Sequence, residues 1–153
     1  MIKQISFALF LIVSLLSTAD VKAQETPLSV GGTLSGLTAK YGHTDAGAAR
    51  ADLSFLLIDT NLFNLDLYYQ LYLNDTDLDI ESGDLRPYLA PGINIGFTDA
   101  TNDLFYGLTF PVGIEYVLED APFEVFFETG PYVQINPSQL FGMSGTIGFR
   151  YRI

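Results

Sequence analysis

Cysteine and tryptophan are both absent from the sequence. Without cysteine, the chain can form no disulfide, build no thiolate metal site and accept no lipid at a signal-peptide cysteine. Basic residues are scarce, since 7 Lys and Arg stand against 18 Asp and Glu, and the formal net charge is −11. Contact with nucleic acid depends on basic patches that meet the phosphates. We therefore expect no nucleic-acid partner.

Long apolar runs are missing after the first 23 residues. Residues 5–16 form a 12-residue apolar stretch broken only by two serines, with Lys3 before it and Val21-Lys22-Ala23 after it. A charged start, a short apolar run and small or apolar residues at −3 and −1 are typical of a secretory signal cleaved before Gln24. An uncleaved anchor is the less favoured alternative, because a spanning helix needs about 20 apolar residues. We predict a signal peptide over 1–23 and one exported domain over 24–153.

The exported domain is rich in alternating apolar and polar residues, most clearly at its end. One face of residues 143–153 carries Met143, Gly145, Ile147, Phe149, Tyr151 and Ile153. A β-strand places successive side chains on opposite faces, so this period predicts a strand with one apolar face. The same alternation occurs in segments 49–58, 62–73, 86–97, 105–118 and 123–135, and two shorter segments lie at about 28–33 and 37–42.

Eight such segments, most of 10 to 14 residues, predict an all-β fold. A tilted membrane strand needs about 9–11 residues, and membrane barrels alternate apolar outward and polar inward residues. We therefore predict a closed antiparallel up-and-down transmembrane β-barrel of about eight strands. Pro87, Pro91 and Pro111 lie inside predicted strands. Since proline has no N–H for the ladder, we expect strand ends or bulges there.

The charged residues follow the polar faces. All five basic residues of the exported domain fall there, namely Lys40, Arg50, Arg86, Arg150 and Arg152. Five acids fall there as well, namely Asp52, Asp66, Glu115, Glu124 and Glu128. The lumen of an eight-stranded barrel is just wide enough for side chains to fill, and buried charges must be paired. We expect a plug of salt bridges rather than an ion path, with Glu124 and Glu128 meeting Arg150 and Arg152.

A soluble β-sandwich is the competing fold, because its strands alternate too. Its exposed face should be rich in lysine and glutamate. Here Lys40 is the only lysine after the predicted cleavage site, and the polar faces carry Gly, Ser, Thr, Tyr and both signs of charge, which favours a barrel lumen. Outward aromatics could form girdles at the membrane interfaces; they are Tyr69, Tyr106, Tyr116, Phe123 and Tyr151.

The final segment Gly-Thr-Ile-Gly-Phe-Arg-Tyr-Arg-Ile resembles the terminal strand that outer-membrane assembly machinery recognises, although Ile153 stands where an aromatic residue is usual. Most of the exported domain resembles small OmpA/OmpX-type eight-stranded outer-membrane barrels, a largely uncharacterised group. The resemblance rests on residues 36–41 (GLTAKY), 111–116 (PVGIEY) and 121–131 (APFEVFFETGP). It implies a bacterial outer-membrane location, lipid and the assembly machinery as partners, and no particular activity.

Candidate chemistry is sparse. Some eight-stranded barrels deacylate lipid A with a His-Ser pair two residues apart, but Asp45 stands two residues after the single histidine, His43. A triad with another serine is conceivable; a solvated loop histidine is the simpler interpretation. We expect no catalytic residue and no cofactor.

The longest predicted connector, residues 74–84, is acidic. It carries alternating oxygen ligands, namely Asp75, Asp77, Asp79 and Glu81. The EF-hand pattern fails, because Ile80 stands where glycine is needed and Arg86 where glutamate is needed. A solvated acidic loop is the preferred interpretation, and a weak divalent-cation site is the alternative. With eight strands, this connector should lie at the same end as both termini, whereas small barrels usually keep long loops outside.

The sequence thus predicts a non-enzymatic outer-membrane barrel with a filled lumen and a structural or surface-interaction role. A narrow pore for small solutes and a lipid-modifying enzyme are the alternatives.

Overall fold

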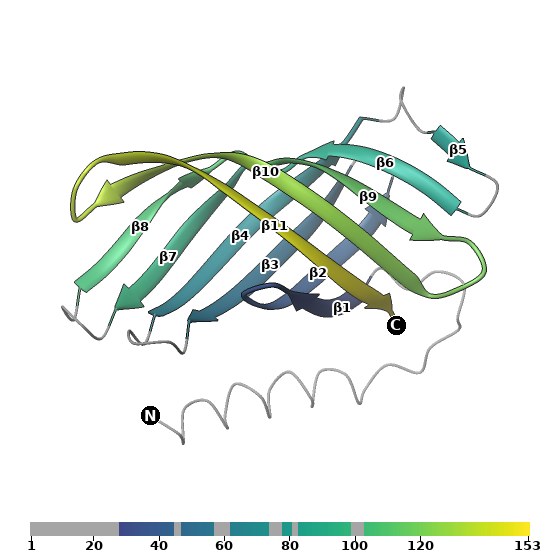
Figure 1. Cartoon of the computed structure of the whole chain (residues 1–153), viewed down its shortest axis with the longest axis horizontal. Coiled ribbons are helices and arrows are strands. Elements are labelled where there is room, and N and C mark those ends of the chain that lie inside the picture. The colour runs from purple at the N-terminus through teal and green to yellow at the C-terminus, as the bar shows by residue number, and fades with distance from the viewer. Residues whose placement is uncertain (1–27, 45–46, 57–61, 74–77, 81–82, 99–102) are drawn as a thin grey trace, which may run out of the picture.

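The structure is a computed structural model that describes residues 28–44, 47–56, 62–73, 78–80, 83–98 and 103–153. The signal peptide predicted over 1–23 lies outside the described residues. The described part is built from antiparallel strands (Figure 1). Their bounds are β1 (Leu28–Thr33), β2 (Gly36–Thr44), β3 (Gly47–Leu56), β4 (Leu62–Tyr72), β5 (Leu78–Ile80), β6 (Gly83–Leu89), β7 (Gly92–Thr98), β8 (Asp103–Thr109), β9 (Val112–Leu118), β10 (Phe123–Asn136) and β11 (Leu140–Arg152).

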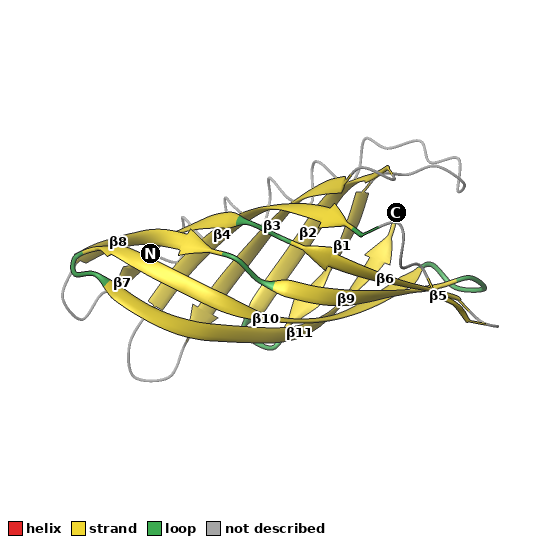
Figure 2. Cartoon of the chain, turned by 90° about the horizontal axis from the view of Figure 1, so that it is seen from above, coloured by secondary structure: helices red, strands yellow, loops and turns green. Residues whose placement is uncertain are grey.

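The strands close into a barrel with eight strand positions around its circumference, which we call staves. Each stave pairs with the next in chain order, and β1 pairs with β11 to complete the circle. Two staves are interrupted, because β6 and β7 form one stave and β8 and β9 form the next. The short strand β5 pairs only with β6 and extends from the end of the barrel where the C-terminus lies (Figures 1 and 2). The predicted closed eight-stranded antiparallel barrel is confirmed.

Prolines cause both interruptions. Pro91 separates β6 from β7, and Pro111 separates β8 from β9, as their missing N–H groups predict. The carbonyl of each is still used, since Pro91 accepts from the N–H of Tyr69 at 3.0 Å and Pro111 from that of Ala90 at 2.9 Å. The third proline, Pro87, lies within β6 and not at a strand end or bulge. It is tolerated there, and its carbonyl accepts from Leu73 at 3.0 Å.

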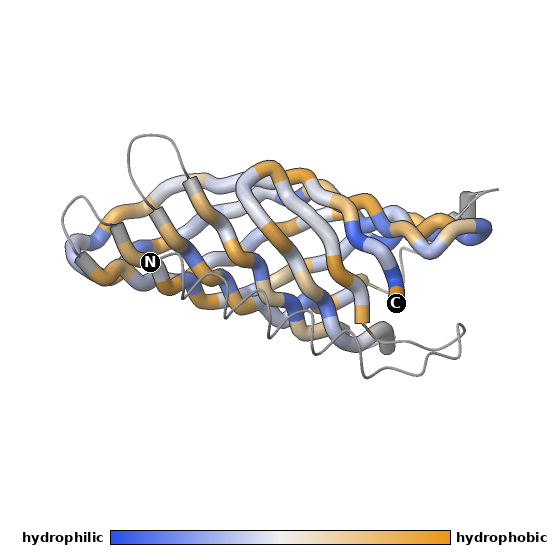
Figure 3. Tube along the Cα trace, turned by 90° about the horizontal axis from the view of Figure 1, so that it is seen from below, coloured by the Kyte–Doolittle hydropathy of each residue, from blue (hydrophilic) through white to orange (hydrophobic). Residues whose placement is uncertain are grey.

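Side chains are distributed inside out relative to a soluble protein. The outer face carries large apolar residues that are exposed on every stave from β2 to β11, whereas most of the fully buried large side chains are polar or charged. Figure 3 shows the resulting alternation of hydrophilic and hydrophobic residues along the strands. Successive side chains of a strand point to opposite faces. The alternating sequence therefore puts apolar residues on one face of the barrel wall and polar residues on the other. The apolar face of this barrel is the outer one.

One detail of β2 differs from the sequence-based expectation. His43 lies in strand β2 rather than in a loop. The ladder with β3 shifts register between Tyr41 and Thr44, and Gly42 adopts a φ of 98° at that shift. Glycine enters this left-handed region without the steric cost that a Cβ would impose, so Gly42 allows the strand to continue past the irregularity.

The two ends of the barrel are unlike. The even number of staves places the start of β1, the end of β11 and the connector between β4 and β6 at one end. The predicted position of the long acidic connector at the end with the termini is therefore correct, although residues 74–77 and 81–82 lie outside the described part. At the opposite end, the β10–β11 hairpin reaches far beyond the β1–β2 hairpin (Figure 1). In the described residues, no helix is long and apolar enough to cross a bilayer.

Candidate functional site: the charged lumen and its cavity

Four buried charges form a neutral cluster in the lumen. The cluster consists of Lys40, Glu115, Glu124 and Arg150, which are all between 0 and 1% exposed. Lys40 Nζ lies 2.8 Å from Glu115 Oε1 and 2.7 Å from Glu124 Oε2. Arg150 Nη2 lies 2.5 Å from Glu115 Oε2, and its Nε lies 3.1 Å from Glu124 Oε2. Two cations therefore neutralise two carboxylates, as burial in a low-dielectric interior requires.

Uncharged donors add hydrogen bonds to the carboxylates of this neutral cluster. Glu115 accepts hydrogen bonds from Gln70 Nε2 at 3.2 Å and from the Tyr72 hydroxyl at 3.0 Å. Glu124 accepts a hydrogen bond from the Ser29 hydroxyl at 3.3 Å. A buried carboxylate needs several donors because each lone pair left without one carries a desolvation cost.

A second group, the Arg50 cluster, consists of Arg50, Asp52 and Glu128. Arg50 donates two hydrogen bonds of 2.7 Å to the two oxygens of Glu128, which is the bidentate geometry that guanidinium and carboxylate prefer. Its Nε lies 3.2 Å from Asp52 Oδ2. The Tyr88 hydroxyl adds a 2.8 Å hydrogen bond to Glu128. One cation here faces two carboxylates.

Aromatic rings fill the space around the two guanidinium groups. Arg150 lies over the ring of Phe126, 4.1 Å from its centroid, and Arg50 lies 4.1 Å from the centroid of Tyr68. Arg50 is also 5.5 Å from the Phe126 centroid, so this ring contacts both clusters. Gly148 makes room for Phe126, since a Cβ built at Gly148 would lie 2.5 Å from the ring. The lumen is thus packed by cation–π contacts as well as ion pairs.

The central ion pairs cross the barrel. Arg50 on β3 and Glu128 on β10 belong to staves four apart in either direction around the circle of eight. Lys40 on β2 and Glu115 on β9 are also four staves apart. A bond between opposite walls spans the full diameter of the lumen. These bonds close the lumen at two levels.

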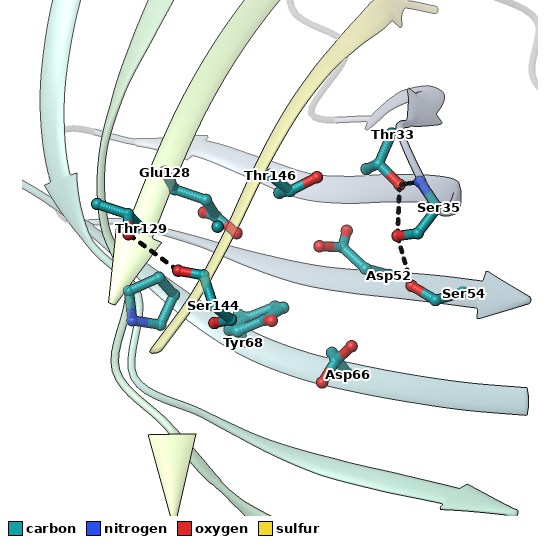
Figure 4. A pocket seen from close by; sticks show the side chains of 12 residues that line it. Thr33, Ser35, Asp52, Ser54, Asp66, Tyr68, Glu128, Thr129, Ser144 and Thr146 are labelled. Atoms are coloured by element: carbon teal, nitrogen blue, oxygen red, sulfur yellow. Dashed lines mark hydrogen bonds between the residues drawn. The ribbon is translucent and has the colours of Figure 1, made fainter. Parts of the chain in front are cut away.

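A small cavity remains beyond the Arg50 cluster, toward the end opposite the termini. Its volume is about 130 Å³, which is space for on the order of ten water molecules. Figure 4 shows the lining carboxyl and hydroxyl groups. The lining side chains are mainly polar and include Thr33, Ser35, Asp52, Ser54, Asp66, Tyr68, Glu128, Thr129, Ser144 and Thr146. Among the residues that the structure describes, no Lys or Arg lines it.

The cavity is lined by more acidic than basic side chains. Asp52 and Asp66 lie directly opposite each other on neighbouring strands. Asp66 accepts a 2.6 Å hydrogen bond from Asn64 and forms no ion pair with the described residues. Asp52 is 5% exposed, and its Oδ1 accepts no hydrogen bond from the described part of the chain. With Glu128, three carboxyl groups therefore line the cavity, and two of them, Asp52 and Glu128, pair with the Arg50 guanidinium.

The charge pairing predicted from the sequence is partly wrong. Glu124 does pair with Arg150, but Glu128 pairs with Arg50 instead of Arg152. Arg152 donates to the carbonyls of Leu118 and Ala121 near the end with the termini. Arg86 contacts Asp84, which belongs to β6 and not to a connector. The expected balance of five basic and five acidic residues in one plug is replaced by three cations and four carboxylates in direct pairs, with Asp66 beside them.

The other sequence candidates fall mostly on residues whose side chains the structure does not describe. The His43 side chain and most of the acidic connector, including Asp75, Asp77 and Glu81, lie outside the described residues. Within the described ranges, no three His, Cys, Asp or Glu side chains come together as metal ligands. The sequence pattern did place Phe126, Tyr68, Gln70 and Tyr88 on the inner faces. It gave no sign of the cavity, because hydroxyl residues of β1 and β11 meet there only through the curvature of the wall.

Comparisons with known proteins provide no relative from which a function could be inferred, so the inference of function depends on the fold and the lumen. No family model matches the chain, and neither a curated protein nor a solved structure is detectably similar to it. The class that the geometry defines is a closed eight-stranded antiparallel β-barrel with an apolar exterior and a charged, side-chain-filled interior.

Proposed function

We propose that the protein is an exported bacterial outer-membrane β-barrel with a non-enzymatic, structural or surface-interaction role. The observation that carries this proposal is the inverted distribution of side chains. An outer face that exposes large apolar residues around the wall suits lipid acyl chains, whereas in water it would drive aggregation. Closure of the barrel also satisfies the backbone without edges over most of the wall, as a hydrocarbon environment requires.

The partners proposed with this role follow from the same surface. Membrane lipid would cover the outer face, and the assembly machinery would engage the last strand, β11. The outer face of β11 exposes Ile147, Phe149 and Tyr151 at alternate positions. These are the apolar positions on which the resemblance to an assembly-recognised terminal strand rests.

The diametrical ion pairs support a filled barrel rather than a pore. Both Lys40–Glu115 and Arg50–Glu128 would have to separate before a solute could pass, and each separation would leave charges buried without partners. We expect purified protein in a planar bilayer to show no stable conductance. Reproducible single-channel steps from protein free of porin contamination would favour the pore instead.

The membrane assignment has a direct test. A folded barrel resists denaturing detergent until it is boiled, so unboiled and boiled samples should migrate differently on a gel. The protein should also sediment with outer membranes after cell fractionation. Recovery in the soluble periplasmic fraction, with no shift on boiling, would remove the membrane proposal while leaving the fold intact.

A further inference from the structure

The barrel wall has an opening beside the cavity. Strand β11 pairs with β1 only over residues 148–152, and the β1–β2 hairpin ends at Thr33 and Gly36. Residues 140–146 of β11 continue past that turn for about 20 Å along the strand, at roughly 3.3 Å per residue. On the other side of the turn, Phe55 of β3 donates to the Ser35 carbonyl at 3.0 Å, and β3 ends one residue later at Leu56. No described strand therefore pairs with residues 140–146 of β11 on the side of the β1–β2 turn, and this unpaired stretch forms the opening.

The backbone of β11 lines this opening with polar groups. Ile147 accepts a hydrogen bond from Leu34, and Ile153 donates to Leu28, so alternate residues of β11 point toward β1. The register with β10 is continuous along the strand. The next alternate residues, Met143 and Gly145, therefore direct their N–H and C=O groups into the opening, where no described strand pairs with them. Lipid alone cannot satisfy such groups.

The opening leads into the cavity described above. Thr33 and Ser35 of the β1–β2 turn form one side, and Ser144 and Thr146 of β11 form the other. The β1–β2 turn is held to β3 by a 3.1 Å hydrogen bond between the hydroxyls of Ser35 and Ser54 (Figure 4). A ligand that moves along the outer face of the barrel can thus reach the cavity through the side of the wall.

The outer surface around the opening is apolar. Leu34 is 81% exposed, Phe141 is 69% exposed and Met143 is 65% exposed, which are the three highest values among the large apolar residues of the described chain. The surface therefore changes from apolar to acidic and hydroxyl-rich between the wall and the cavity. A ligand that fits both parts must be amphiphilic.

The charge of the cavity selects the head group. Three carboxyl groups, but no described Lys or Arg, line the cavity. Asp52 Oδ1 accepts no hydrogen bond from the described residues, and Asp52 and Asp66 are register partners on neighbouring strands. A primary ammonium has three N–H donors for carboxylate and hydroxyl oxygens and needs no fixed coordination geometry. A metal ion is less suitable, because the described residues provide no group of three metal-ligating side chains.

We propose that this opening and its cavity bind a single-chain amphiphile with a primary ammonium head group. The head group lies between Asp52 and Asp66, and the alkyl chain follows the outer wall beside Leu34 and Phe141. The proposal rests on the proposed function, since it places the outer wall in lipid.

The experiment uses the barrel in neutral phosphatidylcholine vesicles with a Leu34→Trp reporter, which gives a unique signal because the chain has no tryptophan. The probes are 12-bromododecylamine and 12-bromododecanol, whose bromine quenches nearby indole. The amine should quench Trp fluorescence saturably, with half-saturation at least tenfold lower than that of the alcohol. An Ile95→Trp reporter on β7 should respond equally to both probes.

Two charge-matched variants separate the site from general attraction to an acidic protein. Asp66→Asn should raise the half-saturation of the amine at least fivefold, whereas Glu119→Gln, an exposed position in the β9–β10 connector, should leave it unchanged. Equal quenching by amine and alcohol, or equal effects of the two variants, would overturn the proposal. If Leu34→Trp does not fold, Met143→Trp places the reporter on the other side of the opening.

The same samples distinguish a failure of the proposed membrane location from a failure of the proposed binding site. Every sample is checked for migration before and after boiling, and for flotation with the vesicles. Protein that neither shifts nor floats contradicts the proposed function. Protein that inserts but does not prefer the amine contradicts only the binding site.

Discussion

Arg50 on β3 binds Glu128 on β10 through two parallel hydrogen bonds of 2.7 Å that cross the lumen between opposite staves. The pair connects two hairpins that are distant in the sequence and do not touch through their backbones. It therefore restrains the barrel across its diameter, whereas the ladder restrains it only around its circumference. Glu128 of this pair also lines the cavity, so stability and the proposed binding site share one carboxylate.

Replacing Arg50 with methionine should strongly destabilise the folded barrel. The substitution keeps much of the side-chain volume but leaves Glu128 and Asp52 buried without their cation, and breaking a buried pair in this way costs about 3–5 kcal/mol. Urea unfolding in lipid vesicles, followed by gel migration, measures the change in the free energy of unfolding.

The matched control is Arg86→Met. Arg86 contacts Asp84 at 2.8 Å, but the two side chains are 24 and 47% exposed, so this change should cost no more than about 1 kcal/mol. The double variant Arg50→Met/Glu128→Met should recover part of the loss, because it removes one of the two stranded carboxylates. Similar losses for Arg50 and Arg86 would show that the crossing pair does not stabilise the lumen.

Gly148→Val should destabilise the barrel through steric overlap with Phe126. A Cβ at Gly148 would lie 2.5 Å from the ring, and the ring is itself confined by two guanidinium groups. Overpacking of this kind costs about 1–3 kcal/mol. Gly32→Ala is the control, since its Cβ would find its nearest neighbour at 3.6 Å. A loss at Gly148 no larger than that at Gly32 would mean that the ring can move aside.

A charge on the outer wall tests whether that wall faces lipid. Leu67 lies in the middle of β4 and is 41% exposed. Leu67→Arg should cost about 2–4 kcal/mol in lipid vesicles if the position lies near the bilayer midplane. Phe97→Arg, near the end of β7, should cost much less, about 0–1 kcal/mol. Equal and small costs at both positions would indicate that water, not acyl chains, surrounds the barrel.

Single cysteines can establish the orientation, because the chain has no cysteine of its own. Ser138 is exposed in the β10–β11 turn, and Asp120 is exposed in the β9–β10 connector at the opposite end. With the termini in the periplasm, a membrane-impermeant maleimide should label Ser138→Cys in intact cells and Asp120→Cys only after lysis. The reverse pattern would place the termini and the acidic connector outside the cell.

The period-two pattern was enough to predict the barrel and the inward faces. Each strand alternates independently of its neighbours, so the identity of its inner face is a local property of the sequence. Lys40, Arg50, Glu115 and Glu124 were assigned to the lumen on this basis, and the structure confirms it. The interruptions at Pro91 and Pro111 were predictable for the same reason, since a missing N–H is also local.

Partners across the lumen were not predictable in this way. Glu128 and Arg152 were expected to pair because they lie on consecutive strands. Which residues face each other across the barrel depends on the tilt and stagger of all eight staves together, and the stagger places Glu128 opposite Arg50. The cavity is a result of the same geometry, because it exists only where a short β1–β2 hairpin meets a long β11.

Order of assembly is a consequence of where the lumen charges lie along the chain. Glu124 and Arg150 face each other within the β10–β11 hairpin. The hairpin therefore contains two opposite charges that neutralise each other without help from the other staves. Lys40 and Glu115 arrive on separate staves and meet only when opposite walls approach. Arg50, by contrast, finds its bidentate partner Glu128 only on β10, so its pairing is complete only after the C-terminal hairpin has joined. We therefore expect closure of the barrel to depend on the arrival of the C-terminal hairpin.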